Sequence, residues 1–186
     1  MRILGVSGSL REGSFNTSLL RAALEAAPDG VELELWNGLA DLPLYDEDLD
    51  GADAPEPVRR LREAWGKADA ILFATPEYNG SVPGGLKNAI DWASRPVRAS
   101  ALNNKTVAVV GASTGQFGAL WAQQDLKRIL GIAGARVVGT EIPVGRAPER
   151  FDGEGRLLDG ELFKQLRLHL TTLAAGAVAT DERIAA

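Results

Sequence analysis

Short apolar runs alternate along this chain with segments of helical periodicity, and this alternation restricts the possible fold more than any other feature. The runs predict five strands, at residues 3–6, 31–35, 70–74, 106–110 and 136–139. Residues 70–74 are apolar throughout, which predicts a central strand, whereas apolar residues alternate with glutamates over 31–35, which predicts an edge strand. Strands that alternate with helices form a parallel sheet with helices on both faces, so we expect a doubly wound α/β fold.

Each of the five helical segments carries apolar residues at the spacing of one helix face. The expected inward stripes are Leu20, Ala23, Leu24 and Ala27; Val58, Leu61, Trp65 and Ala68; Leu86, Ala89 or Ile90, and Ala93; Ala122, Leu126, Ile129, Leu130 and Ala133; and Leu162, Leu166, Leu170 and Leu173. We expect one domain over residues 1–175 and a frayed tail over residues 176–186. The single histidine, His169, is expected to be an exposed residue of the last helix.

The composition excludes several kinds of chemistry. The 186 residues include no cysteine and one histidine, so disulfides, thiolate catalysis and cysteine-based metal sites are excluded, and we expect no metal site. Redox chemistry would therefore come from a bound cofactor. The formal net charge is −5 without any basic cluster, which disfavours nucleic acid and membrane surfaces as partners. Polar residues follow the first apolar run at once, which indicates a strand rather than a signal peptide, so we expect a cytoplasmic location.

The loop after the first strand is rich in hydroxyl groups. Residues 7–18 read SGSLREGSFNTS and lead into the first helix, which Ser14 or Asn16 could cap. Hydroxyls, an amide and free backbone N–H groups at a helix N-terminus suit a terminal phosphate, and Arg11 adds a full positive charge. The segment matches neither the P-loop pattern nor GxGxxG. The alternative interpretation is that these are ordinary capping and turn residues, with Arg11 in solvent.

A second loop leads from the central strand into the third helix. Residues 76–92 read PEYNGSVPGGLKNAIDW. Its glycines allow close backbone approach, Tyr78 offers an aromatic face, and Asn79 can donate and accept hydrogen bonds. These groups suit a planar heterocycle such as an isoalloxazine, although Tyr78 could instead be a packing residue of a turn. Because ligands bind at the carboxyl edge of open α/β sheets, the two loops together predict a mononucleotide site.

Three segments of the chain resemble the NADPH-dependent FMN reductase family, which includes flavodoxin-like quinone, chromate and azo-dye reductases. They are GSLREGSFN at residues 8–16, PEYNGSVPGGLKNAIDW at 76–92 and GASTG at 111–115, and the resemblance covers residues 1–175. It implies a flavodoxin-like three-layer sandwich with a five-stranded parallel sheet of order 2-1-3-4-5. It also implies non-covalently bound FMN, NADPH or NADH as the reductant, and a homodimer or homotetramer.

The resemblance also implies which residues bind the cofactor. It assigns Ser9, Arg11, Ser14, Asn16 and Thr17 to the phosphate end; Pro76, Glu77, Tyr78, Asn79 and Gly80 to the ribityl chain and ring edge; and Ser113, Thr114 and Gly115 to the other side of the ring. Many members of the family are richer in glycine where this chain has Gln116 and Phe117. No catalytic side chain is named, because the flavin carries the hydride chemistry.

The implied reaction is a hydride relay from NAD(P)H through FMN to a quinone or a similar electron-poor acceptor. One alternative is a flavodoxin-like carrier that transfers single electrons without turning over pyridine nucleotide. A second alternative is a flavin-dependent regulator or scaffold, which no specific feature of the sequence favours.

Two surface segments carry further expectations. Residues 41–57 are acidic and contain prolines, which predicts a long surface loop. An alternative is a lid over the acceptor site, with Leu44 and Tyr45 in contact with substrate. Phe117 and Trp121 belong either to the core or, as we favour, to a dimer interface, because aromatic residues are enriched at interfaces.

Overall fold

The computed structural model describes residues 1–51 and 53–185, and its centre is a parallel sheet. The strands follow the order β2-β1-β3-β4-β5, and a further short strand, β6, pairs with β4. Their bounds are Arg2–Ser7 (β1), Glu32–Trp36 (β2), Ala70–Ala74 (β3), Thr106–Ala112 (β4), Arg136–Val137 (β5) and Pro143–Val144 (β6). The predicted α/β class and strand order are confirmed, whereas β6 was not predicted.

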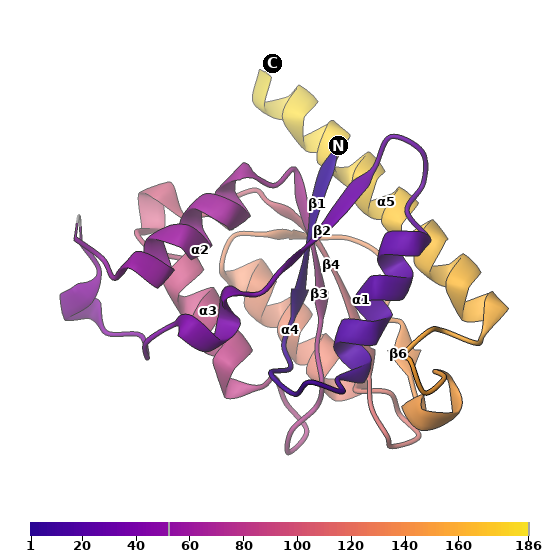
Figure 1. The fold of residues 1–186 in the computed structure, drawn as a ribbon. Helices are drawn as coiled ribbons and strands as arrows, with labels where there is room; N and C mark the ends of the chain where they lie inside the picture. Colours follow the sequence, from indigo (N-terminus) through magenta and orange to yellow (C-terminus); the bar gives the residue numbers. More distant parts are fainter. Residues whose placement is uncertain (52, 186) are drawn as a thin grey trace.

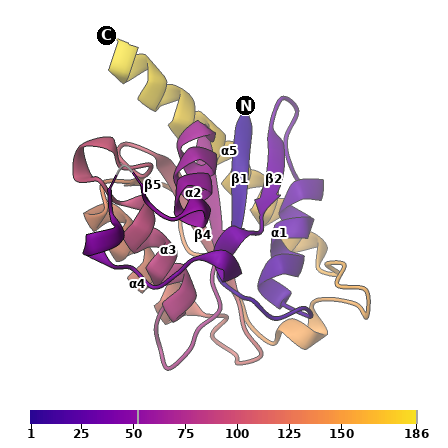
Figure 2. The same cartoon turned by 60° about the vertical axis from the view of Figure 1, so that its left-hand side comes forward.

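Helices cover both faces of this sheet and complete three layers (Figure 1). Their bounds are Phe15–Glu25 (α1), Glu56–Lys67 (α2), Gly84–Ala93 (α3), Leu120–Ile132 (α4) and Gly160–Ala185 (α5). Helices α1 and α5 lie on one face, and α2, α3 and α4 lie on the other, as the turned view in Figure 2 also shows. In the part of the chain that the structure describes, no helix is long and apolar enough to cross a lipid bilayer.

The core is divided by the alternation of side chains along the central strands. In β3, Ile71 and Phe73 pack with α2, α3 and α4, whereas Leu72 and Ala74 pack with α1 and α5. All five residues of β3 are fully buried, so the prediction of a central strand is confirmed. Successive side chains of a strand point to opposite faces, which is why an unbroken apolar run suits a strand covered on both sides.

The inward face of α1 differs from the predicted stripe. Leu20 and Ala23 are buried as expected, but Leu24 is 46% exposed and Leu19 is fully buried. Residues 19, 22, 23 and 26 also follow the i, i+3, i+4, i+7 spacing, so the sequence offers two overlapping apolar stripes. Packing against the sheet selects the second one.

The predicted strand at residues 136–139 is shorter than expected, because the chain turns at Gly139. This residue has φ +74°, and a Cβ atom there would lie 2.5 Å from Cε1 of His169. His169 is 6% exposed, so the expectation of an exposed histidine was wrong. Its ring fills the space beside the turn that separates β5 from β6, and the missing side chain of Gly139 makes this contact possible.

Burial gives His169 an unusual acidity. Desolvation, followed by the nearby charge of Lys127, lowers its pKa to about 4, although Glu141 acts in the opposite direction. Its Nε2 atom is buried without a hydrogen-bond partner among the described residues. The imidazole is therefore neutral in the folded protein at neutral pH.

Acid is expected to destabilise the protein through His169. Below the reference pKa of 6.5, His169 is protonated in the unfolded chain but stays neutral in the folded chain. The free energy of unfolding therefore falls as the pH drops from 6.5 toward 4. The loss should reach about 3 kcal/mol near pH 4. Urea unfolding measured between pH 7 and about 5 tests this, because the carboxylates with lowered pKa values have reference values of 3.8 or 4.5 and contribute mainly below that range. The variant His169→Gln should lose this slope, and an equal slope in both proteins would contradict the assignment.

The C-terminal segment, for which a frayed tail was expected, continues the last helix. Helix α5 continues to Ala185, with Ala177 at 2% and Thr180 at 7% exposure. The hydroxyls of Thr106 and Thr180 lie 3.0 Å apart and join the helix to the start of β4. Small residues at 176, 177 and 180 allow this part of the helix to pack closely on the sheet.

Candidate functional site

Three loops meet at the carboxyl edge of the sheet and enclose a cavity of about 170 Å³. They follow β1, β3 and β4. The lining residues are Ser9, Arg11, Ser14, Phe15, Asn16, Pro76, Glu77, Tyr78, Ala112, Ser113 and Thr114. The structure thus brings nine of the thirteen predicted site residues together. The other four do not line the cavity: Thr17 lies in the first turn of α1, and Asn79, Gly80 and Gly115 lie in the second and third loops.

The first loop enters α1 through a capped N-terminus. Ser14 is the N-cap, and its hydroxyl accepts a hydrogen bond from the backbone N–H of Thr17 at 3.3 Å. The Thr17 hydroxyl lies 3.0 Å from that of Ser7 at the end of β1. Side-chain caps of this kind fix the start of a helix and direct its remaining free N–H groups outward. The positive end of α1 therefore lies at the cavity.

Asn16 joins the first loop to the third. Its Nδ2 atom donates to the carbonyl oxygen of Ala112 at 2.9 Å, and its Oδ1 atom accepts from the backbone N–H of Ala112, also at 2.9 Å. The side chain is 3% exposed. Both polar atoms of the amide are thus bonded to backbone, which favours a role in holding the cavity walls together over a direct cofactor contact.

The second loop is a two-residue turn pinned to α4. Asn79 and Gly80 have φ values of +53° and +75°, and Tyr78 and Ser81 pair on either side of them. Positive φ at both central residues is the type I′ geometry for which Asn-Gly is preferred. Glu77 Oε2 accepts from the N–H of Ala122 at 3.1 Å, so this carboxylate is directed at the first turn of α4.

A neighbouring contact reinforces the same attachment. The Ser81 hydroxyl donates to Asp125 of α4 at 2.7 Å. This hydrogen bond, with Arg128 nearby, lowers the pKa of Asp125. The second loop therefore keeps a fixed position relative to α4, while Tyr78, 55% exposed, stands free at its tip.

The third loop is supported by a segment that the sequence interpretation missed. The N–H of Ser113 donates to Val144 O at 3.1 Å, the N–H of Ala147 donates to Ser113 O at 3.0 Å, and the N–H of Arg146 donates to Gly115 O at 3.0 Å. The close crossing requires Gly145, where a Cβ atom would lie 2.2 Å from Gln116 O. Residues 143–147 thus form a backing for the loop that carries Ser113 and Thr114.

Gln123 of α4 locks this crossing from inside the protein. The residue is fully buried. Its Nε2 atom donates to Gly118 O at 3.0 Å, and its Oε1 atom accepts from the N–H of Ile142 at 3.0 Å. Long polar side chains are rarely buried unless they are fully bonded, and a buried glutamine beside glycines is the signal that could have identified this clamp.

Positive charge enters the cavity from Arg11. Its guanidinium lies 5.6 Å from the ring centroid of Phe15, which in turn stacks on Phe151 at 5.8 Å. Among the described residues, none of the ion pairs includes Arg11. An arginine that is stacked but not paired with a carboxylate keeps its donors available for an anionic ligand.

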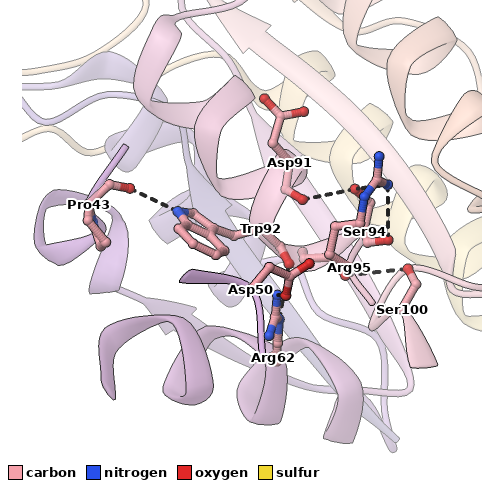
Figure 3. A network of polar contacts seen from close by, with 9 residues as sticks. Pro43, Asp50, Arg62, Asp91, Trp92, Ser94, Arg95 and Ser100 are labelled. Carbon is pink, nitrogen blue, oxygen red and sulfur yellow. Dashed lines mark hydrogen bonds and ion pairs between the residues drawn. The ribbon is translucent and has the colours of Figure 1, made fainter. Parts of the chain in front are cut away.

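Residues 41–51 of the acidic segment lie against α2 and α3, where polar contacts hold them (Figure 3). Trp92 Nε1 donates to Pro43 O at 2.8 Å, and Arg62 pairs with Asp50 at 2.6 Å. The Asn88 side chain donates to Pro43 O at 2.9 Å and accepts from the N–H of Tyr45 at 2.8 Å. Neither Leu44 nor Tyr45 lines the cavity, so the observed position of this segment does not cover it.

Larger hollows lie elsewhere, among them one of about 570 Å³ beside β2 and α2 and one of about 500 Å³ between α3 and α4. Two others measure about 240 and 200 Å³. Volume alone would favour them as ligand sites. Position decides otherwise, because ligands of open α/β sheets bind where loops leave the carboxyl ends of the strands. The smaller cavity is therefore the candidate site, and at about 170 Å³ it can enclose only one end of a mononucleotide.

The donor set of this cavity fits a phosphate and its adjoining polyol. It combines the hydroxyls of Ser9 and Ser14, the N-terminus of α1 and the unpaired Arg11, whereas the exposed ring of Tyr78 stands beside it. Helix N-termini and arginine are the groups with which proteins bind phosphate. Fold and site together define a flavodoxin-like protein with a mononucleotide site.

Comparisons with known proteins specify this class further. Residues 1–149 match the family model of the NADPH-dependent FMN reductases. The chain is 42% identical over 174 residues to an NAD(P)H-dependent FMN reductase of Pseudomonas aeruginosa, covering 93% of each chain. It is 40% identical to a quinone reductase of Escherichia coli K12, covering 92% of each. Among solved structures, it resembles the flavoenzyme NAD(P)H:(acceptor) oxidoreductase FerB of Paracoccus denitrificans, with 36% identity, a TM-score of 0.83 and coverage of 97% of each chain.

The chain belongs to the NADPH-dependent FMN reductase family. It is thus a flavin-dependent oxidoreductase that uses FMN and NAD(P)H, as the resemblance implied.

Proposed function

We propose that this enzyme passes electrons from NAD(P)H to quinones or similar flat, electron-poor acceptors, with FMN held between the loops after β1, β3 and β4. One observation carries the proposal: the three loops converge on a single cavity that contains an unpaired arginine and a helix N-terminus. The quinone reductase of Escherichia coli supports the choice of acceptor, since it is 40% identical over 174 residues.

Within this proposal, the groups around the N-terminus of α1 hold the phosphate. Ser9 and Ser14 contribute hydroxyl or backbone donors, and Arg11 contributes the full positive charge. Thr17 supports them indirectly, because its N–H and hydroxyl are bonded to Ser14 and Ser7. Asn16 acts indirectly, because its amide is bonded to Ala112 at both ends. It fixes the distance between the first and third loops, and so the width of the cavity.

The remaining predicted residues would contact the ribityl chain and ring. Pro76 is buried and fixes the direction of the chain as it leaves β3, while Tyr78, Asn79 and Gly80 are exposed at the rim. Glu77 keeps this rim attached to α4 through Ala122. Ser113, Thr114 and Gly115 form the opposite wall, with residues 143–147 behind them.

FMN held in this cavity would supply the hydride chemistry. The task of this chain is to bind, orient and stabilise charge. Backbone N–H groups of the second and third loops would hold the ring edge, and such fixed dipoles would stabilise negative charge there without reorganising. The rigid attachment of both loops, through Glu77, Ser81 and Gln123, serves this preorganisation.

We further propose that the enzyme is a cytoplasmic homo-oligomer. The cytoplasmic location is supported by the use of NAD(P)H, which is an intracellular reductant. Self-association is supported by an exposed aromatic pair at the start of α4: Phe117 and Trp121 are 50% and 48% exposed, and their ring centroids lie 4.9 Å apart. Large aromatic residues on a surface are characteristic of interfaces.

Anaerobic stopped-flow measurements test the proposed reaction. The FMN-loaded enzyme, mixed with NADH or NADPH, should lose its flavin absorbance with a rate constant on the order of 1–1000 s⁻¹. Mixing the reduced enzyme with a benzoquinone should restore the absorbance at a comparable rate. If the flavin stays oxidised for minutes with both nucleotides but accepts electrons from dithionite, the single-electron carrier is the better description.

A further inference from the structure

Helix α3 presents two faces with different tasks. Asn88 and Trp92, four residues apart, hold the acidic segment by hydrogen bonds. Lys87, Asp91 and Ser94 lie on another face, where they line the hollow of about 500 Å³ between α3 and α4. Figure 3 shows Trp92 directed toward Pro43 and Asp91 directed away from it. The acidic segment and the hollow are therefore separated by the helix that they share.

The hollow has an apolar floor and a basic rim. Ile90 and Ile129 contribute to its lining, together with Val97 and Ile132, which are 70% and 76% exposed. Two exposed isoleucine and valine side chains in one concave surface form an apolar patch of the kind that marks interaction sites. Together these residues line a hollow, the α3/α4 groove.

Charges around the α3/α4 groove are predominantly positive. Arg95 and Arg128 belong to its lining, and Lys87 does too, although it is neutralised by Asp91 at 2.7 Å. Arg128 lies 3.4 Å from Asp125, a mostly exposed contact that binds its charge weakly. The groove therefore suits an occupant that is apolar at its tip and acidic beside it.

The acidic segment carries such a tip. Leu44 is 84% exposed, although the backbone on either side of it is fixed by Asn88, which bonds Pro43 O and the N–H of Tyr45. These bonds hold the leucine side chain out in solvent at a defined place. They also prevent it from reaching the groove of its own chain, because Asn88 lies on the other face of α3.

Acidic side chains follow directly after this leucine. Asp41, at the start of the segment, and Asp50, within it, are paired with Arg60 and Arg62. In the part of the chain that the structure describes, no ion pair involves Asp46, Glu47 or Asp48. An exposed leucine beside three unpaired carboxylates is complementary to the α3/α4 groove in both polarity and charge.

We propose that the acidic segment of one copy docks in the α3/α4 groove of a second copy of this chain, with Leu44 on the apolar floor and residues 46–48 facing Arg95 and Arg128. A twofold dimer makes such a contact twice, since each copy offers both the tip and the groove. Trp121, Arg128 and Ile132 share one face of α4, seven and four residues apart, so the contact is continuous with the exposed aromatic pair. The inference rests on the proposed self-association and names its surface.

The first experiment compares matched leucine substitutions. Leu44→Asp should raise the dimer dissociation constant at least about tenfold in sedimentation velocity. Leu168→Asp serves as the control, because this leucine is 68% exposed on α5, across the sheet, and should leave the constant unchanged. Raising the salt concentration from about 0.05 to about 0.5 M should weaken the wild-type dimer, because salt screens the attraction between exposed charges.

The second experiment uses the absence of cysteine from this chain. Leu44→Cys and Ile132→Cys proteins, each loaded with FMN, are mixed and oxidised. The disulfide-linked dimer of Leu44→Cys with Ile132→Cys should form faster than the dimer of Leu44→Cys with Leu168→Cys. Both circular dichroism and flavin content identify any variant that has failed to fold.

Three results separate the ideas being tested. A wild-type chain that sediments as a monomer at every concentration would overturn both self-association and its surface. A wild-type dimer that Leu44→Asp leaves intact, with no preferred 44–132 cross-link, would overturn the surface alone. Neither result bears on hydride transfer, which the stopped-flow measurement tests separately.

Discussion

Replacement of Arg62 by alanine is expected to lower the free energy of unfolding by about 3 kcal/mol, the lower end of the range for breaking a buried ion pair. The Arg62 and Asp50 side chains are only 17% and 9% exposed, and they meet at 2.6 Å. Arg62 also donates to Trp92 O at 3.1 Å and lies 5.8 Å from the ring of Trp92 (Figure 3). Its removal leaves the Asp50 carboxylate without its partner in a poorly solvated place.

Urea unfolding of the variant and of a control measures this loss. Arg60→Ala is the control, because its ion pairs with Glu56 and Asp41 are more than half exposed and should contribute less than about 1 kcal/mol. If Arg62→Ala and Arg60→Ala are equally stable, the pair is not desolvated as its burial indicates. The double variant Arg62→Met with Asp50→Leu should recover much of the loss, since it removes both charges together.

Replacement of Arg11 by alanine is expected to weaken FMN binding by about 10- to 100-fold, the equivalent of one charge-assisted hydrogen-bond set worth roughly 1.5–3 kcal/mol. The expected cause is loss of the unpaired positive charge at the cavity, where the helix N-terminus alone contributes about half a charge. Titration of the apoprotein, followed by the quenching of flavin fluorescence, gives the dissociation constant.

Two controls make this result specific for the phosphate. Riboflavin lacks the phosphate, so Arg11→Ala and the wild type should bind it equally. Arg21→Ala, an exposed arginine farther along α1, should bind FMN as the wild type does. An Arg11→Ala protein with wild-type FMN affinity would place this side chain in solvent, and an equal loss for riboflavin would indicate a damaged loop.

The parts of this fold that were predictable are those set by short-range patterns. The unbroken apolar run of residues 70–74 identified the central strand. Ser14, which caps α1, was one of the two caps considered, because a cap needs only neighbouring residues. The approach of the first and second loops was predicted from topology alone. Gly8 contributes to it, since a Cβ atom there would lie 2.8 Å from Leu86.

The features that were missed depend on partners far away in the chain. Asn16 bonds Ala112, 96 positions later, so its sequence neighbours suggest a ligand contact and not a link between loops. Strand β6 has only two residues, one of which is a proline. Two residues are too few to show the alternation of apolar and polar side chains that predicts a strand. His169 looked exposed because nothing in its own helix shows that Gly139 leaves room for its ring.

The way the cavity walls are attached has a consequence for engineering. The side chains of Asn16, Glu77 and Gln123 bond backbone groups of β4, α4 and the segments at residues 118 and 142. Tyr78 and Thr114 are exposed at the rim, and among the described residues neither side chain makes such a bond. Scaffold and rim are thus carried by different side chains. Libraries that randomise Tyr78 and Thr114 but keep Asn16, Glu77 and Gln123 should change which oxidants the enzyme prefers and leave the coenzyme site intact.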